Sequence, residues 1–314
     1  MRGIWEIACG LDAFEYSGHN DCMANDARNV VCDLCPKACL IASGQSGECR
    51  IRVNINGRLV AVTYAHPCSA HIDPIEKKPL YHFLPGTGIL SIATVGCNLH
   101  CKNCQNWQIS QRNPEDYPSQ ELPPAEVVRL AGEHRCLSVA YTYSEPLVFY
   151  EYTLDTCIKA REAGLRNALV TAGYINRKPM EKLCAHVDAA NIDLKAMSDR
   201  FYRNICGGTL KPVLRTLVLA KSLGVWVELT NLVIPTLNDS DANLRALCVW
   251  VKENMGADTP LHFSRFHPQY QMKNLPATPA STLDRAREIA RAEGLHYVYA
   301  VSYTHLTLPT KRIV

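Results

Sequence analysis

The 314-residue sequence lacks any uninterrupted apolar run near the roughly 20 residues that a membrane-spanning helix needs. Its first residues, MRGIWEIACGLDAFEYSGHN, carry acidic side chains and do not combine a basic start with an apolar stretch, as a secretory signal would. The 33 basic and 30 acidic residues are scattered, so the extended basic face that nucleic-acid binding uses is missing. We therefore expect a cytoplasmic protein that binds neither nucleic acid nor a membrane.

Cysteine is the residue that the sequence has in excess, with 15 in all. A chain of this length can bury a core without disulfide staples, and it shows no export signal. An odd number of cysteines also cannot pair completely. Ligation of a metal ion or an iron–sulfur cluster is therefore the expected use of some of these thiols.

From residue 88 onward, short apolar runs alternate with helical patterns. The expected strands span 89–95, 137–143, 167–173, 190–196, 226–235 and 261–267, and the expected helices span 124–133, 148–163, 177–186, 211–223, 240–254 and 281–293. Almost continuous apolar strands joined by helices predict a parallel sheet with helices on its outside. Six such units fit either an open sheet or a partial barrel.

Polar residues at the ends of the expected strands favour the barrel. These residues are Cys97, Glu145, Thr171, Asp193 with Lys195, Asn231 and His267. In (β/α) barrels, side chains at the carboxyl ends of the strands converge on one mouth and form the active site. The predicted fold class is therefore α/β, a partial (β/α)6 TIM-like barrel with a small N-terminal cysteine-rich module.

We divide the chain into four parts. Residues 1–27 are an unassigned N-terminal extension, residues 28–87 the cysteine-rich module, residues 88–300 the barrel domain and residues 301–314 a tail. The tail, VSYTHLTLPTKRIV, resembles translated sequencing-adapter sequence, and we interpret it as non-native. Within the module, the alternating run RIRVNINGRLVAVTY predicts a strand pair around a turn at Asn56 and Gly57.

Three cysteines lie close together directly after the first expected barrel strand. Cys97, Cys101 and Cys104 have the spacing Cys-x3-Cys-x2-Cys, and no fourth cysteine follows at a matching spacing. An iron–sulfur cubane held by only three thiolates leaves one iron open to a small molecule. Spacing alone leaves two other interpretations open: a zinc site completed by a distant ligand such as His100, or three free cysteines.

Longer strings around these cysteines narrow the interpretation. GCNLHCKNC resembles the signature of radical S-adenosylmethionine (SAM) enzymes, and CQNWQIS, DPIEKKPLYHFLPG, YTYSEPLVFYEY and NIDLKA extend the match within about residues 28–300. With these strings the sequence is similar to the radical SAM member of the AmmeMemoRadiSam system, which is related to pyruvate formate-lyase activating enzymes. The resemblance implies a 4Fe–4S cluster, SAM that is cleaved reductively to a 5′-deoxyadenosyl radical, and a radical SAM core domain at residues 88–300. The substrate stays open.

The resemblance also implies roles for individual residues. Cys97, Cys101 and Cys104 would hold the cluster, and Glu145 would accept hydrogen bonds from the SAM amino group. Asp193 and Lys195 would reach the ribose and carboxylate of SAM. Two structural alternatives remain: Glu145 could be an acidic residue favoured by the dipole of the helix that follows it, and Asp193 could form an ion pair with Lys195.

Asn231 and His267 lie at strand ends on the predicted mouth, so each is a candidate for contact with SAM or the substrate, with a structural role as the alternative. Many radical SAM enzymes have an aromatic residue directly before the third cysteine that stacks on adenine, whereas this sequence has Asn103. Trp107 and Tyr143 are the candidates for that ring.

A second cysteine set, which we call the cysteine quartet, lies in the N-terminal module. It consists of Cys32, Cys35, Cys39 and Cys49. Four thiolates can close a site for zinc or for a second iron–sulfur cluster, and free thiols are the alternative. The resemblance further implies a low-potential electron donor of the flavodoxin or ferredoxin class, and Memo-like and AMMECR-like partners. The competing functions are activation of a glycyl radical protein, and electron transfer or metal binding without catalysis.

Overall fold

The computed structural model describes residues 28–301 and 311–312, and its centre is a single sheet in the order β12-β11-β10-β9-β8-β7-β6-β5-β13. The strands are β5 (Ser69–Pro74), β6 (Gly88–Ala93), β7 (Ser138–Tyr141), β8 (Arg166–Thr171), β9 (Ala189–Asp193), β10 (Trp226–Val233), β11 (Leu261–Arg265), β12 (Val298–Val301) and β13 (Lys311–Arg312). Strands β6 to β12 are parallel, β5 is antiparallel to β6, and β13 is antiparallel to β5. Because β12 and β13 are its two edges, the sheet is a partial barrel.

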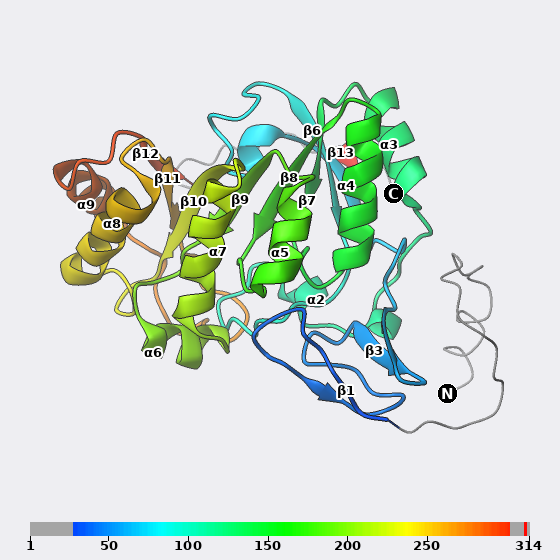
Figure 1. Ribbon diagram of the computed structural model, residues 1–314. Coiled ribbons are helices and arrows are strands. Elements are labelled where there is room, and N and C mark those ends of the chain that lie inside the picture. The colour runs from blue at the N-terminus through cyan, green and yellow to red at the C-terminus, as the bar shows by residue number, and fades with distance from the viewer. Residues whose placement is uncertain (1–27, 302–310, 313–314) are drawn as a thin grey trace.

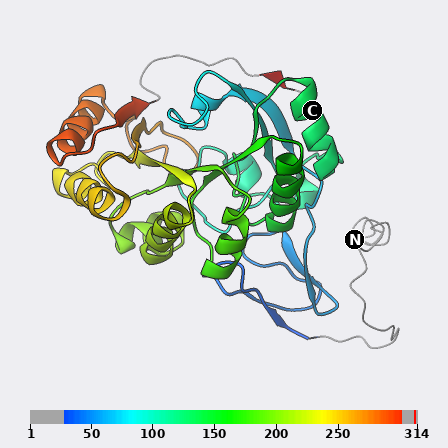
Figure 2. The same cartoon turned by 45° about the horizontal axis from the view of Figure 1, so that its top comes forward.

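Helices cover the outer face of this curved sheet, as Figures 1 and 2 show. The covering helices are α3 (Pro124–Glu133), α4 (Tyr150–Glu162), α5 (Arg177–Cys184), α7 (Leu210–Ser222), α8 (Asp241–Met255) and α9 (Ala280–Ala292). The other helical elements are short: α2 (Trp107–Ser110), α6 (Asp199–Phe201), the 3-10 turns η1 (Ile75–Lys77) and η2 (Pro114–Asp116), and the π-helix η3 (Tyr202–Cys206). None of the helices in the described ranges is long and apolar enough to cross a membrane.

Helix α8 begins and ends at residues that are typical helix caps. Ser240 accepts a hydrogen bond from the Asn243 backbone N–H at 3.3 Å and so caps the start of α8, which ends at Gly256. Along α7, Val213 and Leu217 are one helical turn apart, and both are buried. This spacing turns one apolar face toward the sheet.

The predicted fold class is confirmed, with one correction. All six expected strands and all six expected helices are present, shifted by a few residues at their ends. The sheet has a seventh parallel strand, β12, which pairs with β11 and which the sequence prediction missed. This strand is only four residues long and ends at Val301, the first residue of the expected tail, so the apolar periodicity of the sequence gives little signal for it.

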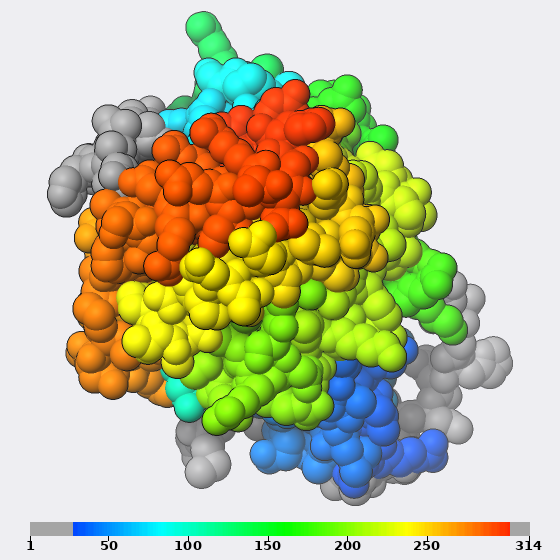
Figure 3. Space-filling model, turned by 90° about the vertical axis from the view of Figure 1, so that its left-hand side faces the viewer, coloured from blue at the N-terminus to red at the C-terminus, as the bar shows by residue number. Residues whose placement is uncertain are grey.

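The cysteine-rich module contributes two small hairpins, β1 (Val30–Val31) with β2 (Leu40–Ile41) and β3 (Arg52–Ile55) with β4 (Arg58–Ala61). The turn between β3 and β4 has φ values of 51° at Asn56 and 84° at Gly57, which confirms the predicted hairpin. The two hairpins lie at the lower edge of the molecule, in blue in Figures 1 and 3, below the carboxyl ends of the barrel strands.

The four predicted parts of the chain stay a prediction. Strand β5 pairs with β6 along its length, so residues 69–74 belong to the central sheet although they lie within the expected module. In the expected tail, Lys311 and Arg312 pair with Ile72 and His71 as β13. Residues 1–27, 302–310 and 313–314 lie outside the described residues.

Residues 75–87, which we call the amino-end segment, run across the amino ends of the barrel strands. The Glu228 carboxylate accepts hydrogen bonds from the backbone N–H groups of Tyr81 at 3.0 Å and His82 at 2.8 Å. Asn191 donates to the Pro79 carbonyl at 2.8 Å. Because these contacts hold the segment against β9 and β10, the carboxyl ends of the strands are the end left for a site.

Candidate active site

The three closely spaced cysteines lie in the loop of residues 94–106, which we call the cysteine loop and which follows the carboxyl end of β6. Cys101 is buried, and Cys97 and Cys104 are partly buried. Burial raises the pKa of the Cys97 thiol well above its usual value, and negative charge on Glu145 and Cys101 raises it further. Glu145 therefore lies within electrostatic reach of the loop, as the predicted convergence at the mouth requires.

Backbone hydrogen bonds hold the cysteine loop in shape. The Gly96 N–H donates to the Ile109 carbonyl at 3.0 Å, and the Cys104 N–H donates to the Cys101 carbonyl at 3.1 Å. Two further backbone hydrogen bonds join the loop to η3. The His100 N–H donates to the Cys206 carbonyl at 2.8 Å, and the Lys102 N–H donates to the Ile205 carbonyl at 2.9 Å. The loop is therefore fixed from two sides, by α2 and by η3.

Gly96 is required where the cysteine loop meets the N-terminal module. Its φ is +95°, and a Cβ atom there would lie 2.6 Å from the Cys49 carbonyl oxygen and 2.7 Å from Cγ2 of Ile51. The module thus packs directly on the loop, at a distance that only glycine permits.

Gly96→Ala is expected to destabilise the protein by about 1–3 kcal/mol more than a matched glycine substitution without a clash, because overpacking adds to the backbone strain. Gly164→Ala is that control, since Gly164 has a φ of +80° with nothing within 4 Å of its added Cβ. Urea unfolding of both variants measures the difference. Equal losses in the two variants would show that the contact with Cys49 does not matter.

Glu145 is almost fully buried, with 2% of its surface exposed, and it joins the ends of β7 and β8. Its carboxylate accepts hydrogen bonds from the Thr171 hydroxyl at 2.5 Å, from the Ala172 N–H at 2.9 Å and from the Leu147 N–H at 3.2 Å. Burial raises its pKa to about 7 although these donors oppose the shift. A carboxylate can accept about four hydrogen bonds, so there is room for one more donor.

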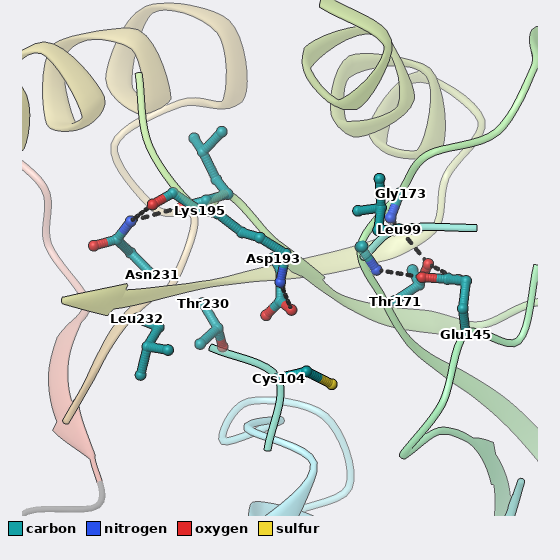
Figure 4. A network of polar contacts seen from close by, with 12 residues as sticks. Leu99, Cys104, Glu145, Thr171, Gly173, Asp193, Lys195, Thr230, Asn231 and Leu232 are labelled. Atoms are coloured by element: carbon teal, nitrogen blue, oxygen red, sulfur yellow. Dashed lines mark hydrogen bonds and ion pairs between the residues drawn. The ribbon is translucent and has the colours of Figure 1, made fainter. Parts of the chain in front are cut away.

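Asp193 and Lys195 form an ion pair at the end of β9, with 2.7 Å between Lys195 Nζ and Asp193 Oδ2. Figure 4 shows Cys104 on the side of Asp193 that faces away from Lys195. Burial by itself would lower the pKa of Lys195, but Asp193 and Cys101 outweigh it and hold that pKa well above its usual value. The ammonium group therefore stays charged, and its positive charge favours the thiolate forms of Cys101 and Cys104.

Asn231 of β10 holds the chain that directly follows β9. Its Nδ2 donates to the backbone carbonyls of Leu194 at 2.7 Å and Lys195 at 3.1 Å (Figure 4). Its Oδ1 is buried and has no hydrogen-bond partner among the described residues. His267 lies exposed in the loop after β11. Within residues 28–301, no polar contact joins His267 to the other candidate residues.

Sequence reasoning missed Cys206, the last residue of η3. Its thiol is fully buried within electrostatic reach of the Cys101 thiol, and its backbone carbonyl accepts a hydrogen bond from the His100 N–H of the cysteine loop at 2.8 Å. The two cysteines are far apart in the sequence, and η3 is an irregular helix that no periodic pattern predicts. The only available signal was the string ICGG, in which two glycines follow the cysteine.

Comparison with known proteins identifies the family. The sequence profile of the radical SAM superfamily matches residues 91–248, which is just over half of the chain. The chain belongs to the radical SAM superfamily. An uncharacterized protein of Methanocaldococcus jannaschii is 49% identical over 274 residues, covering 87% of this chain and 81% of the relative.

One further similarity is to the sequence of an enzyme, and another is to the fold of a solved structure. The pyruvate formate-lyase-activating enzyme of Clostridium pasteurianum is 27% identical over 191 residues, covering 58% of this chain and 76% of that enzyme. The crystal structure of Streptococcus suis SuiB bound to precursor peptide SuiA has a TM-score of 0.53 at 15% identity, covering 66% of this chain and 47% of that chain. At this low sequence identity, the similarity to SuiB concerns the fold alone.

The radical SAM family implies a 4Fe–4S cluster and SAM, and the residues at the mouth fit both groups. The cysteine loop offers three thiols, and the positive charge of Lys195 favours the thiolate forms of Cys101 and Cys104, which suits a cluster that leaves one iron open. The Oδ1 atoms of Asn103 and Asn231 are buried without a hydrogen-bond partner in the described part of the chain. Such acceptors are costly unless a donor reaches them, and a bound ligand with amino and hydroxyl groups carries such donors.

The two rings considered for adenine stacking both have partners within the protein. Trp107 stacks on Tyr270, with ring centroids 5.1 Å apart and an angle of 12° between the planes. Tyr143 donates its hydroxyl to Asp73, and the Lys78 ammonium lies 4.1 Å from the centre of its ring. Stacking of either ring on adenine stays a prediction.

The four thiols of the cysteine quartet surround one small cavity. Burial raises the pKa of Cys35 to about 11, and negative charge on Cys32 and Cys49 adds to the shift. In residues 28–301 and 311–312, no three His, Cys, Asp or Glu side chains are arranged to hold a single metal ion. Binding of one zinc ion would therefore require the quartet thiols to move toward one another.

Proposed function

We propose that this protein is the radical SAM enzyme of an AmmeMemoRadiSam system, with the cluster held by Cys97, Cys101 and Cys104. The observation that carries the proposal is the cysteine loop at the carboxyl end of β6, with Glu145 and Lys195 within electrostatic reach of its thiols. The assignment to that system is supported by the strings around the cysteines and at residues 73–86, 141–152 and 191–196. The substrate is the part that these residues do not specify.

When bound, the cluster and SAM supply the chemistry, which is reductive cleavage of SAM to a 5′-deoxyadenosyl radical that abstracts hydrogen from the substrate. The protein residues bind and orient. In this proposal Glu145 has one free acceptor site for the amino group of SAM, because three of its four are already used. Asp193 offers a carboxylate to the ribose hydroxyls, and Lys195 offers an ammonium group to the SAM carboxylate.

The test is anaerobic reconstitution of the full chain with iron and sulfide, followed by reduction in the presence of SAM. We expect 5′-deoxyadenosine and methionine in equal amounts, detected by chromatography, and none when the reductant is omitted. Absence of 5′-deoxyadenosine from a protein that has taken up iron and sulfide would refute the proposed reaction.

Glu145→Gln is expected to weaken SAM binding about ten- to a hundredfold, because a hydrogen bond to a charged group contributes about 1.5–3 kcal/mol. Glu181→Gln, which changes an exposed glutamate paired with Arg177 on α5, is the matched control. Isothermal titration of SAM into the reconstituted proteins gives both dissociation constants. Equal affinities for the two variants would mean that Glu145 has only a structural role.

The second candidate function is activation of a glycyl radical protein. Its support is the similarity to the pyruvate formate-lyase-activating enzyme of Clostridium pasteurianum. This function predicts a stable radical on a partner protein after incubation with the reduced enzyme and SAM. Electron spin resonance on candidate partners distinguishes it, since 5′-deoxyadenosine without any partner radical would argue against it.

For partners, we propose a low-potential electron donor of the flavodoxin or ferredoxin class and the Memo-like and AMMECR-like proteins of the same system. An electron donor is needed because cleavage of SAM consumes one electron. Replacement of the chemical reductant by a reduced flavodoxin should sustain 5′-deoxyadenosine formation. Titration calorimetry with the purified Memo-like and AMMECR-like proteins tests the remaining partners.

We also propose that the cysteine quartet is a second metal site, for zinc or for a further iron–sulfur cluster. Its support is that all four cysteines line one cavity, where four thiols are enough to close a coordination sphere. Metal analysis of a variant with alanine at the three cysteine-loop positions isolates this site. Zinc, or iron with sulfide, bound to that variant would identify its occupant, and a variant free of metal would refute the second site.

A further inference from the structure

The chain between β7 and Glu145 contains a strained turn. Tyr143 has a φ of 63°, and the Ser144 N–H donates to the Thr142 carbonyl at 2.8 Å. This hydrogen bond closes a three-residue γ-turn with a positive φ at its centre, which is the rare and strained form of that turn. A strained residue of this kind persists only where the surrounding structure holds it, and such residues cluster at functional sites.

The γ-turn, residues 142–144, contacts both ends of the cysteine loop. The Ser144 hydroxyl donates to the Thr94 carbonyl at 2.6 Å, and Asn106 Nδ2 donates to the Tyr143 carbonyl at 2.7 Å. Residues 94 and 106 are the first and last residues of the loop. Because Glu145 directly follows the γ-turn, the conformation of the turn sets where Glu145 lies relative to the loop.

The side chain of Tyr143 is held by a buried ion pair. Its hydroxyl donates to Asp73 Oδ2, and the Lys78 ammonium lies 4.1 Å from the centre of its ring. Asp73 and Lys78 are both buried, and Lys78 Nζ lies 2.7 Å from the same carboxylate oxygen. Hydrogen bonds to charged groups and cation–π contacts are stronger where water is excluded. These two contacts therefore stabilise Tyr143 in its strained conformation.

We propose that Tyr143 is a positioning residue for SAM binding. The hydrogen bond from its hydroxyl to Asp73 holds the γ-turn, and the γ-turn places the Glu145 carboxylate for the amino group of SAM. This inference rests on the proposed function, because it takes Glu145 as the acceptor for that group. Without the hydroxyl, the turn relaxes toward a negative φ, and SAM must restore the strained form when it binds.

The first test is isothermal titration of SAM into reconstituted Tyr143→Phe. This variant lacks the hydroxyl but keeps the ring, so loss of stacking on adenine cannot explain an effect. Asp73 keeps its ion pair with Lys78, so the fold should be retained. We expect about tenfold weaker binding of SAM, since the strain at one such residue corresponds to roughly that factor, with unchanged iron and sulfide counts.

The matched control is Tyr152→Phe. It also removes a buried tyrosine hydroxyl, which donates to the Leu122 carbonyl at 2.5 Å from α4. This variant should bind SAM with the wild-type affinity. An affinity of Tyr143→Phe equal to that of Tyr152→Phe would refute the proposal.

Alanine and glycine at position 143 test whether the strain is the cause. Both remove the hydroxyl and the ring, but glycine adopts a positive φ without the steric cost that alanine has. We therefore expect Tyr143→Gly to bind SAM more tightly than Tyr143→Ala. Loss of packing alone would weaken both variants equally, and that result would contradict the proposal.

The outcomes separate this inference from the proposed function. A wild-type protein that takes up iron and sulfide but forms no 5′-deoxyadenosine would refute the proposed function, and this inference with it. A wild-type protein that cleaves SAM, together with unchanged SAM affinity in Tyr143→Phe, would refute only the role of Tyr143.

Discussion

Alanine at any one of Cys97, Cys101 and Cys104 is expected to reduce 5′-deoxyadenosine formation to the level measured without enzyme. Three thiolates bind three of the four irons of a cubane and leave one iron open. Loss of one ligand therefore exposes a second iron and releases or deforms the cluster. Removal of a residue that the chemistry cannot proceed without has a far larger effect than removal of a positioning contact. Product chromatography together with iron and sulfide counts per chain measures both consequences.

The matched control for these variants is Cys184→Ala, which changes a buried cysteine at the end of α5. It should retain iron, sulfide and activity, since its thiol only fills space in the core. Cleavage of SAM at the wild-type rate in any of the three cysteine-loop variants would show that the cluster is held elsewhere in the chain.

Asp73→Asn is expected to lower the free energy of unfolding by about 3–5 kcal/mol, because it leaves the buried Lys78 without its counter-charge. Asp73 and Lys78 are 1% and 2% exposed, and Lys78 Nζ lies 2.7 Å from Asp73 Oδ2. Lys77 lies 3.0 Å from the other carboxylate oxygen. This ion pair joins β5 to the amino-end segment. Its loss should therefore also weaken the packing of that segment across the amino ends of the barrel strands.

Urea unfolding of Asp73→Asn, compared with the double variant Asp73→Asn/Lys78→Met, tests whether the buried charge is the cause. The double variant should regain much of the lost stability, since an apolar side chain replaces the unpaired ammonium group. Glu181→Gln, which breaks the exposed pair with Arg177, should cost less than about 1 kcal/mol. A double variant no more stable than Asp73→Asn would contradict the explanation.

The same pair predicts how stability depends on pH. Burial would raise the pKa of Asp73, but Lys78, Tyr143 and Lys77 outweigh burial and hold that pKa well below its usual value. The contribution of the ionised Asp73 is therefore present above about pH 4, the ordinary pKa of aspartate, and is lost as the pH falls toward the lowered pKa. Burial lowers the pKa of Lys78 to about 8, so the pair carries both charges only below about that pH. Asp73→Asn should remove this part of the acid dependence.

Local patterns in the sequence determined the elements of this protein and the three proposed cluster ligands. The strands and helices follow from apolar periodicity, and the hairpin at Asn56 and Gly57 follows from turn chemistry. Cys97, Cys101 and Cys104 fall within one loop, so their spacing alone brings them together. The relation to radical SAM enzymes was equally local, because it lies in short strings of residues.

Only the tertiary structure decided which distant side chains meet at the mouth. Thr171 donates a hydrogen bond to Glu145, Trp107 stacks on Tyr270, and the His100 N–H donates a hydrogen bond to the Cys206 carbonyl. Each of these pairs joins different elements, so it depends on strand order, on the position of η3 and on how the loops pack, and no local periodicity encodes these. The physical reason is that hydrogen bonds and ring contacts act over a few ångströms, whereas the chain between the partners runs through whole strands and helices.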